Sequence, residues 1–233
     1  MKLNTVVCFL AASCMLKNAD GFKRTYATQA SYSCHIINPI IQDTILPEYI
    51  RSMHQSKAPN GEDKLAKTPK YYTQVQQYLP EVMLKNNLKI YPDYNEALAA
   101  SRKFRKPLML YFTAIYSINC RIMETRVWTA PEIIQLLKDS FIIAPLFVDA
   151  HDVYIPENEW YYSSALNRKV HTLGERNSDL QISTYDTNAQ PYNFFLNTDG
   201  KKLISEGYGF DKSVEKFRKI LEEALKNYHI LHS

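Results

Sequence analysis

The stretch that decides the fold reads Leu110-Tyr111-Phe112-Thr113-Ala114-Ile115-Tyr116-Ser117-Ile118-Asn119-Cys120-Arg121-Ile122-Met123-Glu124. It begins inside Leu108–Thr113, an apolar run of strand length without polar alternation, which predicts a buried central strand. A helix is predicted from Ser117, with Ile118, Ile122 and Met123 on one face. The segment is therefore a strand, a short loop and a helix, with a single cysteine near the start of the helix.

Further elements are predicted on the N-terminal side of this segment. Apolar residues at helical spacing predict one helix before Pro80: Tyr71, Val75, Tyr78 and Leu79. Leu88–Tyr91 is predicted to be a short strand. Asp93 is expected to cap a helix that runs through Phe104 and is stopped by Pro107.

The C-terminal side repeats the alternation of strands and helices. Pro131 suits the first turn of a helix over Glu132–Asp139. Later elements are a buried strand (Phe141–Val148), an irregular aromatic insertion (150–173), a helix (Gly174–Tyr185) and a strand (Tyr192–Leu196). Asp199-Gly200 indicates a hairpin that pairs Tyr192–Leu196 with Lys202–Tyr208. Asp211 is expected to cap a last helix with one apolar stripe: Val214, Phe217, Ile220, Leu221 and Leu225.

This element order predicts an α/β fold with helices on both faces of a central sheet. The final hairpin makes the sheet mixed rather than fully parallel, which is the thioredoxin arrangement. Residues 88–233 are expected to form this domain, with the insertion at about 150–173. Residues 21–87 are expected to be a partly helical or irregular extension and linker, interrupted by Asn60-Gly61 and several prolines.

The N-terminus predicts export. Lys2 is followed by fourteen uncharged residues and then Lys17, which is typical of a secretory signal peptide over residues 1–20 and too short to span a bilayer. Leu10–Cys14 also resembles a bacterial lipoprotein signal, so Cys14 is either a lipid attachment site or an apolar signal residue. We expect a protein of the periplasm or cell envelope, with membrane contact only if Cys14 is lipidated.

Composition excludes several function classes. With 28 Lys+Arg against 24 Asp+Glu, the net charge of +4 is too small to indicate nucleic-acid binding. The six glycines form no phosphate-binding loop, and the scattered histidines show no metal-ligand spacing. Neither a cofactor nor a metal is expected. The four cysteines, Cys8, Cys14, Cys34 and Cys120, form no disulfide framework.

Residues about 88–228 resemble the C-terminal thioredoxin-like domain of the DsbD-type thiol:disulfide interchange proteins. The family pattern is roughly D-F-T-x-x-x-C-x-N-C-R-x-M-E-x-x-V-W. Matching residues are Phe112, Thr113, Asn119, Cys120, Arg121, Met123, Glu124, Val127 and Trp128, and later Phe147-Val148-Asp149, Gly174-Glu175 and Asn188-Ala189-Gln190-Pro191-Tyr192. The resemblance implies a thiol:disulfide oxidoreductase that passes reducing equivalents to envelope proteins.

Two departures from the family pattern affect the chemistry. Ser117 stands where the family has its nucleophilic cysteine, and Tyr111 stands where it has a buried aspartate that would assist proton transfer. A serine hydroxyl neither ionises near neutral pH nor forms a disulfide, so dithiol–disulfide cycling within this S-x-x-C motif is excluded.

The roles of the remaining motif residues stay open. Cys120 is either a monothiol that forms mixed disulfides or a buried residue that packs like a small apolar one, which we favour. By resemblance Glu124 is a candidate proton carrier; as a plain helix residue it would be solvated and pair with Arg121 or Arg126, and we favour this second interpretation. Pro191 matches the family's cis proline, which leaves the backbone of Gln190 free to pair with a bound peptide, unless it only shapes the turn.

These residues lead to two main hypotheses. The first is a degenerate thioredoxin-fold protein that binds a partner or protein client without disulfide turnover. The alternative is a thiol:disulfide oxidoreductase that acts through Cys120 alone or through Cys120 with Cys34. The aromatic cluster Trp160-Tyr161-Tyr162 is either a lid over the peptide groove or ordinary packing.

Overall fold

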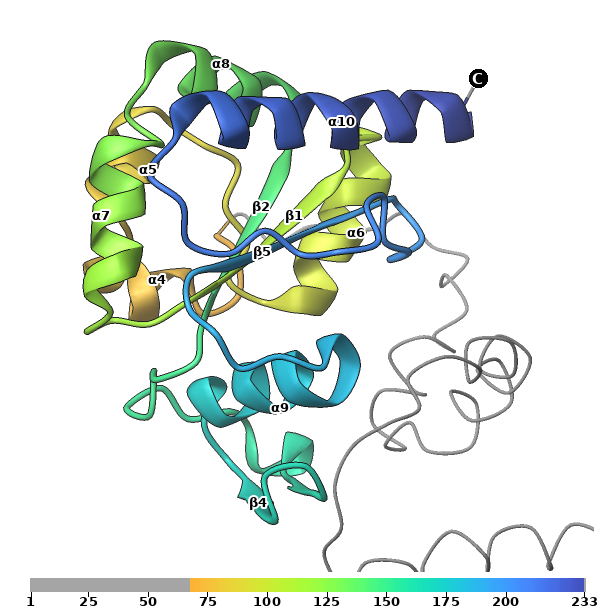
Figure 1. Cartoon of the computed structure of the whole chain (residues 1–233). Helices are drawn as coiled ribbons and strands as arrows, with labels where there is room; N and C mark the ends of the chain where they lie inside the picture. The colour runs from red at the N-terminus through yellow and green to blue at the C-terminus, as the bar shows by residue number, and fades with distance from the viewer. Residues whose placement is uncertain (1–67, 233) are drawn as a thin grey trace, which may run out of the picture. The chain divides into compact units, whose positions relative to one another are not determined.

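The structure, a computed structural model, describes residues 68–232 (Figure 1). All of these residues belong to one compact unit. The expectations for the signal segment, for Cys14 and Cys34, and for the linker up to residue 67 lie outside the described residues.

A three-stranded mixed sheet forms the centre of the fold, in the order β2-β1-β5. Strand β1 (Leu108–Thr113) pairs in parallel with β2 (Ile142–Phe147) and antiparallel with β5 (Tyr192–Leu196). Every residue of β1 is buried, as its continuous apolar run predicted. The predicted mixed sheet with a buried central strand is confirmed.

Helices cover both faces of this sheet. On one face lie α6 (Tyr94–Phe104) and α9 (Leu173–Tyr185); on the other lie α7 (Ile118–Arg126), α8 (Pro131–Ser140) and α10 (Val214–His232) (Figure 1). The strand period of two divides β1 between two cores, because alternate side chains point to opposite faces. Met109 and Tyr111 join the core under α7, α8 and α10, whereas Leu110 and Phe112 join the core under α6 and α9.

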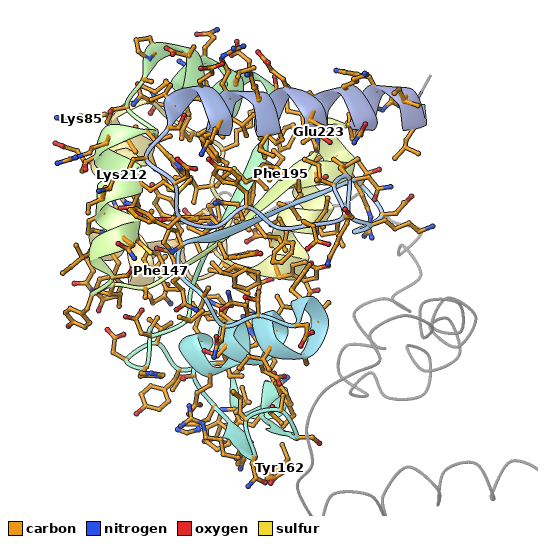
Figure 2. All side chains as sticks on the ribbon, in the orientation of Figure 1. Lys85, Phe147, Tyr162, Phe195, Lys212 and Glu223 are labelled. Atoms are coloured by element: carbon orange, nitrogen blue, oxygen red, sulfur yellow. The ribbon has the colours of Figure 1, made fainter. Side chains whose placement is uncertain are left out.

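Aromatic side chains fill much of the larger core. Trp128, at the end of α7, stacks on Phe217 of α10, with ring centroids 6.0 Å apart and planes 7° apart. Phe147 and Phe195 lie inside the domain, whereas Tyr162 and Lys85 project from its edge (Figure 2). Buried rings of this size contribute strongly to core stability.

Residues 71–87 of the predicted extension, together with Leu88, pack against the same core. The predicted helix is divided into α4 (Tyr72–Val75) and the 3₁₀ helix η1 (Gln76–Tyr78), and Pro80 precedes a further helix, α5 (Glu81–Lys85). Buried apolar residues of this segment belong to the core cluster that contains Trp128: Tyr71, Val75, Leu79, Val82, Met83 and Leu88.

The predicted strand Leu88–Tyr91 is reduced to a single bridge. Ile90 pairs in parallel with Ile143, through hydrogen bonds from the Tyr91 amide to Ile143 and from the Ile143 amide to Lys89, both 2.9 Å long. Pro92 follows at once and has no amide hydrogen to extend the ladder.

The second strand of the predicted hairpin, Lys202–Tyr208, does not form. The turn at Gly200, which has φ of 82°, returns the chain to β5, but only two isolated bridges result, Leu196 with Lys202 and Asn193 with Tyr208. Between these bridges residues 203–207 face only residues 194 and 195. A continuous ladder needs equal numbers of residues on both sides, so the longer side bulges.

The buried face of α7 and the cap of α10 differ from those predicted. Ile118 is 74% exposed, because it stands in the first turn of α7, and the buried face of that helix is Cys120, Met123 and Glu124. The last helix starts at Val214, and Ser213, rather than Asp211, accepts the Lys216 amide. The predicted cap at Asp93 is confirmed, and Ser117, from which the helix was predicted to run, is the N-cap of α7.

The insertion is partly ordered as secondary structure. It contains the 3₁₀ helix η2 (Glu157–Glu159) and a two-stranded antiparallel sheet of β3 (Tyr161–Ser163) and β4 (Arg168–Val170). Trp160 donates to the Ile155 carbonyl, and Tyr161 donates to Asp179 of α9. These contacts favour the interpretation of this aromatic cluster as packing of the insertion onto α9.

Candidate functional site

The candidate site lies where β1 ends and α7 begins. Residues 114–117 join the two elements, and Asp149, just beyond β2, holds this loop. Its carboxylate accepts the amide of Ile115 at 2.8 and 2.9 Å, and that of Tyr116 at 3.5 Å. Parallel strands end at the same edge of a sheet, so β2 brings Asp149 to the loop that follows β1. The sequence showed Asp149 only as a family match and did not reveal this role.

Ser117 begins α7 as its N-cap. Its Oγ accepts the backbone amide of Cys120 at 3.3 Å, which satisfies one of the free amide groups of the first turn. The Cys120 thiol lies on the inner side of this turn and is completely buried. The motif therefore presents a hydroxyl, and no accessible thiol, at the start of the helix.

Below this turn, Glu124 is buried against β1. Its Oε1 accepts the phenol hydrogen of Tyr111 at 2.7 Å and a hydrogen of the Arg121 guanidinium, also at 2.7 Å. Nη2 of Arg121 lies 3.4 Å from Oγ1 of Thr113 as well. Glu124 is only 2% exposed, so it is not the solvated residue that the sequence favoured, although its pairing with Arg121 is as expected.

Burial dominates the electrostatics of this group. It raises the pKa of Glu124 to about 7, against the opposing effects of the Tyr111 hydrogen bond and the Arg121 charge. Burial, reinforced by the neighbouring Glu124, also raises the pKa of Tyr111 well above its ordinary value of 10. Tyr111 therefore remains a protonated donor at neutral pH and cannot replace an aspartate as a base.

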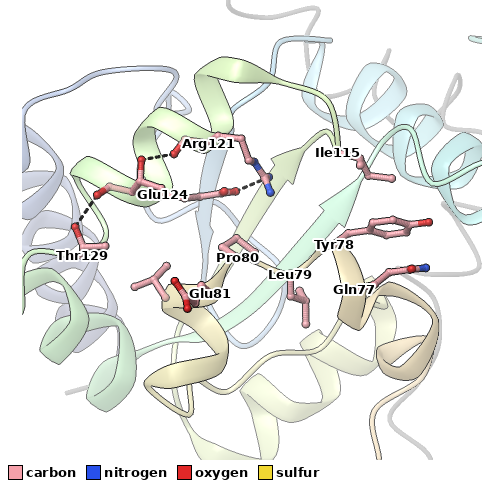
Figure 3. A pocket seen from close by; sticks show the side chains of 11 residues that line it. Gln77, Tyr78, Leu79, Pro80, Glu81, Ile115, Arg121, Glu124 and Thr129 are labelled. Atoms are coloured by element: carbon pink, nitrogen blue, oxygen red, sulfur yellow. Dashed lines mark hydrogen bonds and ion pairs between the residues drawn. The ribbon is translucent and has the colours of Figure 1, made fainter.

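A cavity of about 340 Å³ opens beside the pair (Figure 3). Residues 77–82 form one wall, and Ile115 together with four residues of α7 and the turn after it forms the other: Arg121, Glu124, Thr125 and Thr129. The side chains of Arg121 and Glu124 reach into it from α7, opposite Leu79 and Pro80 (Figure 3). This cavity is not predictable from the sequence, because one of its walls, residues 77–82, comes from the predicted extension.

Gln190 and Pro191 lie at the same edge of the sheet as the Ser117 loop. The peptide bond between them is cis, as the resemblance implied. Tyr192 pairs with Phe112, so Pro191 lies at the level of the end of β1. The Gln190 side chain donates to Oε1 of Gln181 on α9 at 2.7 Å, and Gln181 in turn donates to the Ala189 carbonyl at 2.8 Å.

Of the predicted site residues, the structure thus joins Ser117 to Cys120 by a hydrogen bond and places Glu124 one turn further along α7. Gln190 and Pro191 reach the site edge through β5. In residues 68–232 no cluster of three or more potential metal ligands occurs.

Comparison with known proteins agrees with this geometry. Residues 89–197 match a family model described as thioredoxin-like. This region is a thioredoxin-like domain. Its candidate site lies between the central strand and the helix that follows it. No curated protein matches the chain.

Solved structures similar to the thioredoxin-like domain include a DsbH oxidoreductase, 20% identical over 57% of this chain and 82% of that one, with a TM-score of 0.44. A thioredoxin from Thermus thermophilus is 21% identical over 63% of this chain and 93% of its own, with a TM-score of 0.45. The reduced C-terminal domain of DsbD from Neisseria meningitidis is 18% identical over 55% and 90%, with a TM-score of 0.36.

Proposed function

We propose that this protein is a thioredoxin-fold binding module, related to DsbD-type interchange proteins, that holds a partner or client protein without dithiol turnover. The proposal rests on the serine at position 117. It occupies the exposed start of α7, where a thioredoxin-like reductase needs its nucleophilic thiolate, and its hydroxyl is engaged as the helix cap.

The other groups around the motif support the same conclusion. A reactive cysteine needs access to its substrate and stabilisation of its thiolate. Cys120 is completely buried, and the nearest residue on β1 that could have served as its base is Tyr111, whose burial keeps the phenol protonated. The motif therefore lacks the nucleophile, an accessible second thiol and the aspartate of the family pattern.

The surface around Ser117 suits protein binding. Tyr116 is 88% exposed and Ile118 is 74% exposed, although both are large and apolar. Neighbouring exposed apolar side chains of this kind mark interaction sites. Tyr116 and Ile118 would give an extended client segment an apolar contact, and the backbone beside Pro191 would pair with that segment through main-chain hydrogen bonds.

A disulfide-reduction assay with insulin tests the redox half of the proposal. We expect wild type and Cys120→Ser to be equally silent, and Ser117→Cys to gain turnover, because it restores the thiol at the N-terminus of α7. Wild-type turnover that disappears in Cys120→Ser would instead establish a monothiol oxidoreductase.

Binding is tested with a peptide that has no free thiol, the carboxymethylated insulin B chain. We expect it to shift the NMR amide signals of Tyr116, Ile118 and Gln190, and we expect the shifts to be lost in Tyr116→Ser/Ile118→Ser. Tyr162→Ser is the matched control, because Tyr162 is a similarly exposed aromatic on the β3–β4 insertion. Equal loss in both variants, or no shift in wild type, contradicts the proposed surface.

We further propose an envelope location for the protein. The support is the N-terminal sequence, in which a basic residue precedes a short uncharged run. Among residues 68–232, no helix is long and apolar enough to cross a bilayer. Cell fractionation of wild type and Cys14→Ala tests this: loss of membrane association in Cys14→Ala means a lipid anchor, whereas recovery of both with cytosolic markers contradicts export.

A further inference from the structure

The cavity between residues 77–82 and α7 contains polar groups that the domain itself does not fully use. Every hydrogen bond that Glu124 receives from the described residues ends on Oε1. Its second carboxylate oxygen, Oε2, receives none of them, although the side chain is almost completely buried and lines the cavity. Because no described group donates to Oε2, only water or a ligand in the cavity can satisfy this acceptor.

Arg121 offers the complementary group. Its side-chain hydrogen bonds to the described residues all leave from Nη2, toward Glu124 and Thr113, and its Nε is buried with no acceptor. The side chain is 37% exposed and reaches over the cavity (Figure 3). The cavity thus contains one unused acceptor and unused donors, carried by two neighbouring groups whose charges offset each other.

The remaining lining combines an apolar wall with polar side chains at its rim, and the charge of Glu81 there is offset by its ion pair with Lys85. Leu79, Pro80 and Val82 form the wall that faces Arg121 and Glu124, and Ile115 closes one end. The volume of about 340 Å³ lies at the lower end of the range of roughly 300–1,000 Å³ that is usual for small-molecule sites. An apolar cavity with a few convergent polar groups is the general form of such sites.

We propose that this cavity is a binding site for a small, neutral carboxamide with an apolar body. Its NH₂ group donates to Oε2 of Glu124, its carbonyl accepts from the guanidinium of Arg121, and its apolar part lies against Leu79 and Pro80. A carboxylate ligand lacks the donor and is repelled by an ionised Glu124, whereas an amidinium lacks the acceptor and is repelled by Arg121. The inference concerns a surface other than Tyr116 and Ile118, so it does not depend on the proposed client binding.

Three ligands of one shape test this chemistry: benzamide, benzoate and benzamidine. We would titrate each into the ¹⁵N-labelled full-length chain at pH 8, where Glu124, with its pKa of about 7, is mostly ionised. The readouts are the Nε–Hε signal of Arg121 and the backbone amides of Val82 and Thr125. We expect benzamide to shift all three with a dissociation constant on the order of millimolar, as befits a fragment, and at least tenfold tighter than either charged ligand.

Thr125→Trp is the blocking variant. Thr125 is exposed and lines the cavity, and its hydroxyl bonds only to carbonyls of its own helix, so an indole there fills the cavity at little cost to the fold. Arg126→Trp, at the next exposed position outside the lining, is its control. Benzamide shifts that vanish in Thr125→Trp and persist in Arg126→Trp support the site. No shift in wild type, shifts that survive in Thr125→Trp, or preferred binding of benzoate or benzamidine overturns it.

Discussion

The phenol of Tyr111 donates a 2.7 Å hydrogen bond to Glu124, and this bond joins the central strand to the helix that carries the motif. Arg121 donates to the same carboxylate oxygen from one turn earlier in α7. Tyr111, Arg121 and Glu124 thus form one hydrogen-bonded network beneath the start of α7. The carboxylate at its centre lies next to the candidate site, and both donors are engaged at its Oε1.

The raised pKa of Glu124 predicts that stability falls as the pH rises. In the unfolded chain this carboxyl titrates near 4.5, whereas in the folded domain it titrates at about 7. Between these values the folded state holds more protons, so the free energy of unfolding decreases as pH rises through this window and levels off above 7. The full effect is at most about 3 kcal/mol. Urea unfolding at pH 5 and pH 8 measures it.

Glu124→Gln should remove most of this pH dependence. The amide oxygen can still accept from Tyr111 and Arg121, but the side chain no longer has to become charged in a buried place. The matched control is Glu132→Gln, which changes an exposed glutamate in the first turn of α8 and should leave the slope intact. An unchanged slope in Glu124→Gln would mean that another group controls stability in this range.

Tyr111→Phe should raise the pKa of Glu124 above about 7. The Tyr111 hydrogen bond lowers this pKa, because it stabilises the charged form, and phenylalanine removes only the hydroxyl. The variant should also lose roughly 1 kcal/mol of stability. A ¹³C NMR titration of the Glu124 carboxyl carbon reports the midpoint directly.

Tyr185→Phe provides the comparison for this titration. Tyr185 is another buried phenol, and it is hydrogen-bonded to Tyr94. It lies in the core under α6 and α9, on the opposite face of the sheet from Glu124. It should therefore leave the Glu124 midpoint where it is in wild type. A downward shift in Tyr111→Phe, or equal shifts in both variants, would show that the bond does not stabilise the ionised carboxylate.

The sequence predicted the elements whose local signals agree with their tertiary surroundings. Leu108–Thr113 is apolar without alternation, and it lies in the centre of the sheet with both faces covered. Asp93 precedes its helix and accepts an amide of the first turn, as expected of a cap, and the helix predicted from Ser117 begins at the next residue. At these positions propensity, periodicity and packing favour the same structure, which is why a single sequence suffices.

Predictions from the sequence were wrong where contacts between distant parts of the chain determine the structure. Lys202–Tyr208 resembles a strand, but its register against β5 is broken by extra residues. The burial of Glu124 depends on Tyr111, thirteen residues away, and on residues 77–82, which come from a segment assigned to the extension. One local signal was overlooked: Thr172 and Glu175 have the spacing of a capping box, and they form one at the start of α9.

Arg176→Met should destabilise the domain by roughly 3–5 kcal/mol, because it leaves a buried carboxylate without its cation. Arg176 and Asp93 are both nearly completely buried and are joined by a 2.8 Å hydrogen bond, and Asp93 also caps α6. Denaturant unfolding measures the loss. The double variant Arg176→Met/Asp93→Asn should recover part of it, since the uncompensated charge is removed.

The surface pair Arg218–Glu222 on α10 supplies the control for this charge effect. Its members are 36% and 48% exposed, so Arg218→Met should cost less than about 1 kcal/mol. Comparable losses in Arg176→Met and Arg218→Met would show that burial of the Asp93 pair has little energetic weight.

Gly174 of α9 lies in close contact with the backbone on both sides of Asp149. A Cβ atom on Gly174 would lie 2.7 Å from the Ala150 nitrogen and 3.0 Å from the Val148 oxygen. Both are backbone atoms, so no side-chain rotation can relieve the contact. Gly174→Ala must therefore push residues 148–150 away from α9, at a cost of about 1–3 kcal/mol. Because Asp149 lies between these contacts and holds the Ile115 amide, the NMR signal of that amide should move with it.

Gly209→Ala separates this effect from the general consequences of replacing glycine. Its nearest neighbours would be ring atoms of Tyr192 at 3.3 and 3.4 Å, which belong to a side chain that can adjust. Its stability should therefore stay within about 0.5 kcal/mol of wild type, and its Ile115 signal should be unchanged. If Gly174→Ala leaves both quantities unchanged as well, the approach of α9 to residues 148–150 does not control the loop at the start of α7.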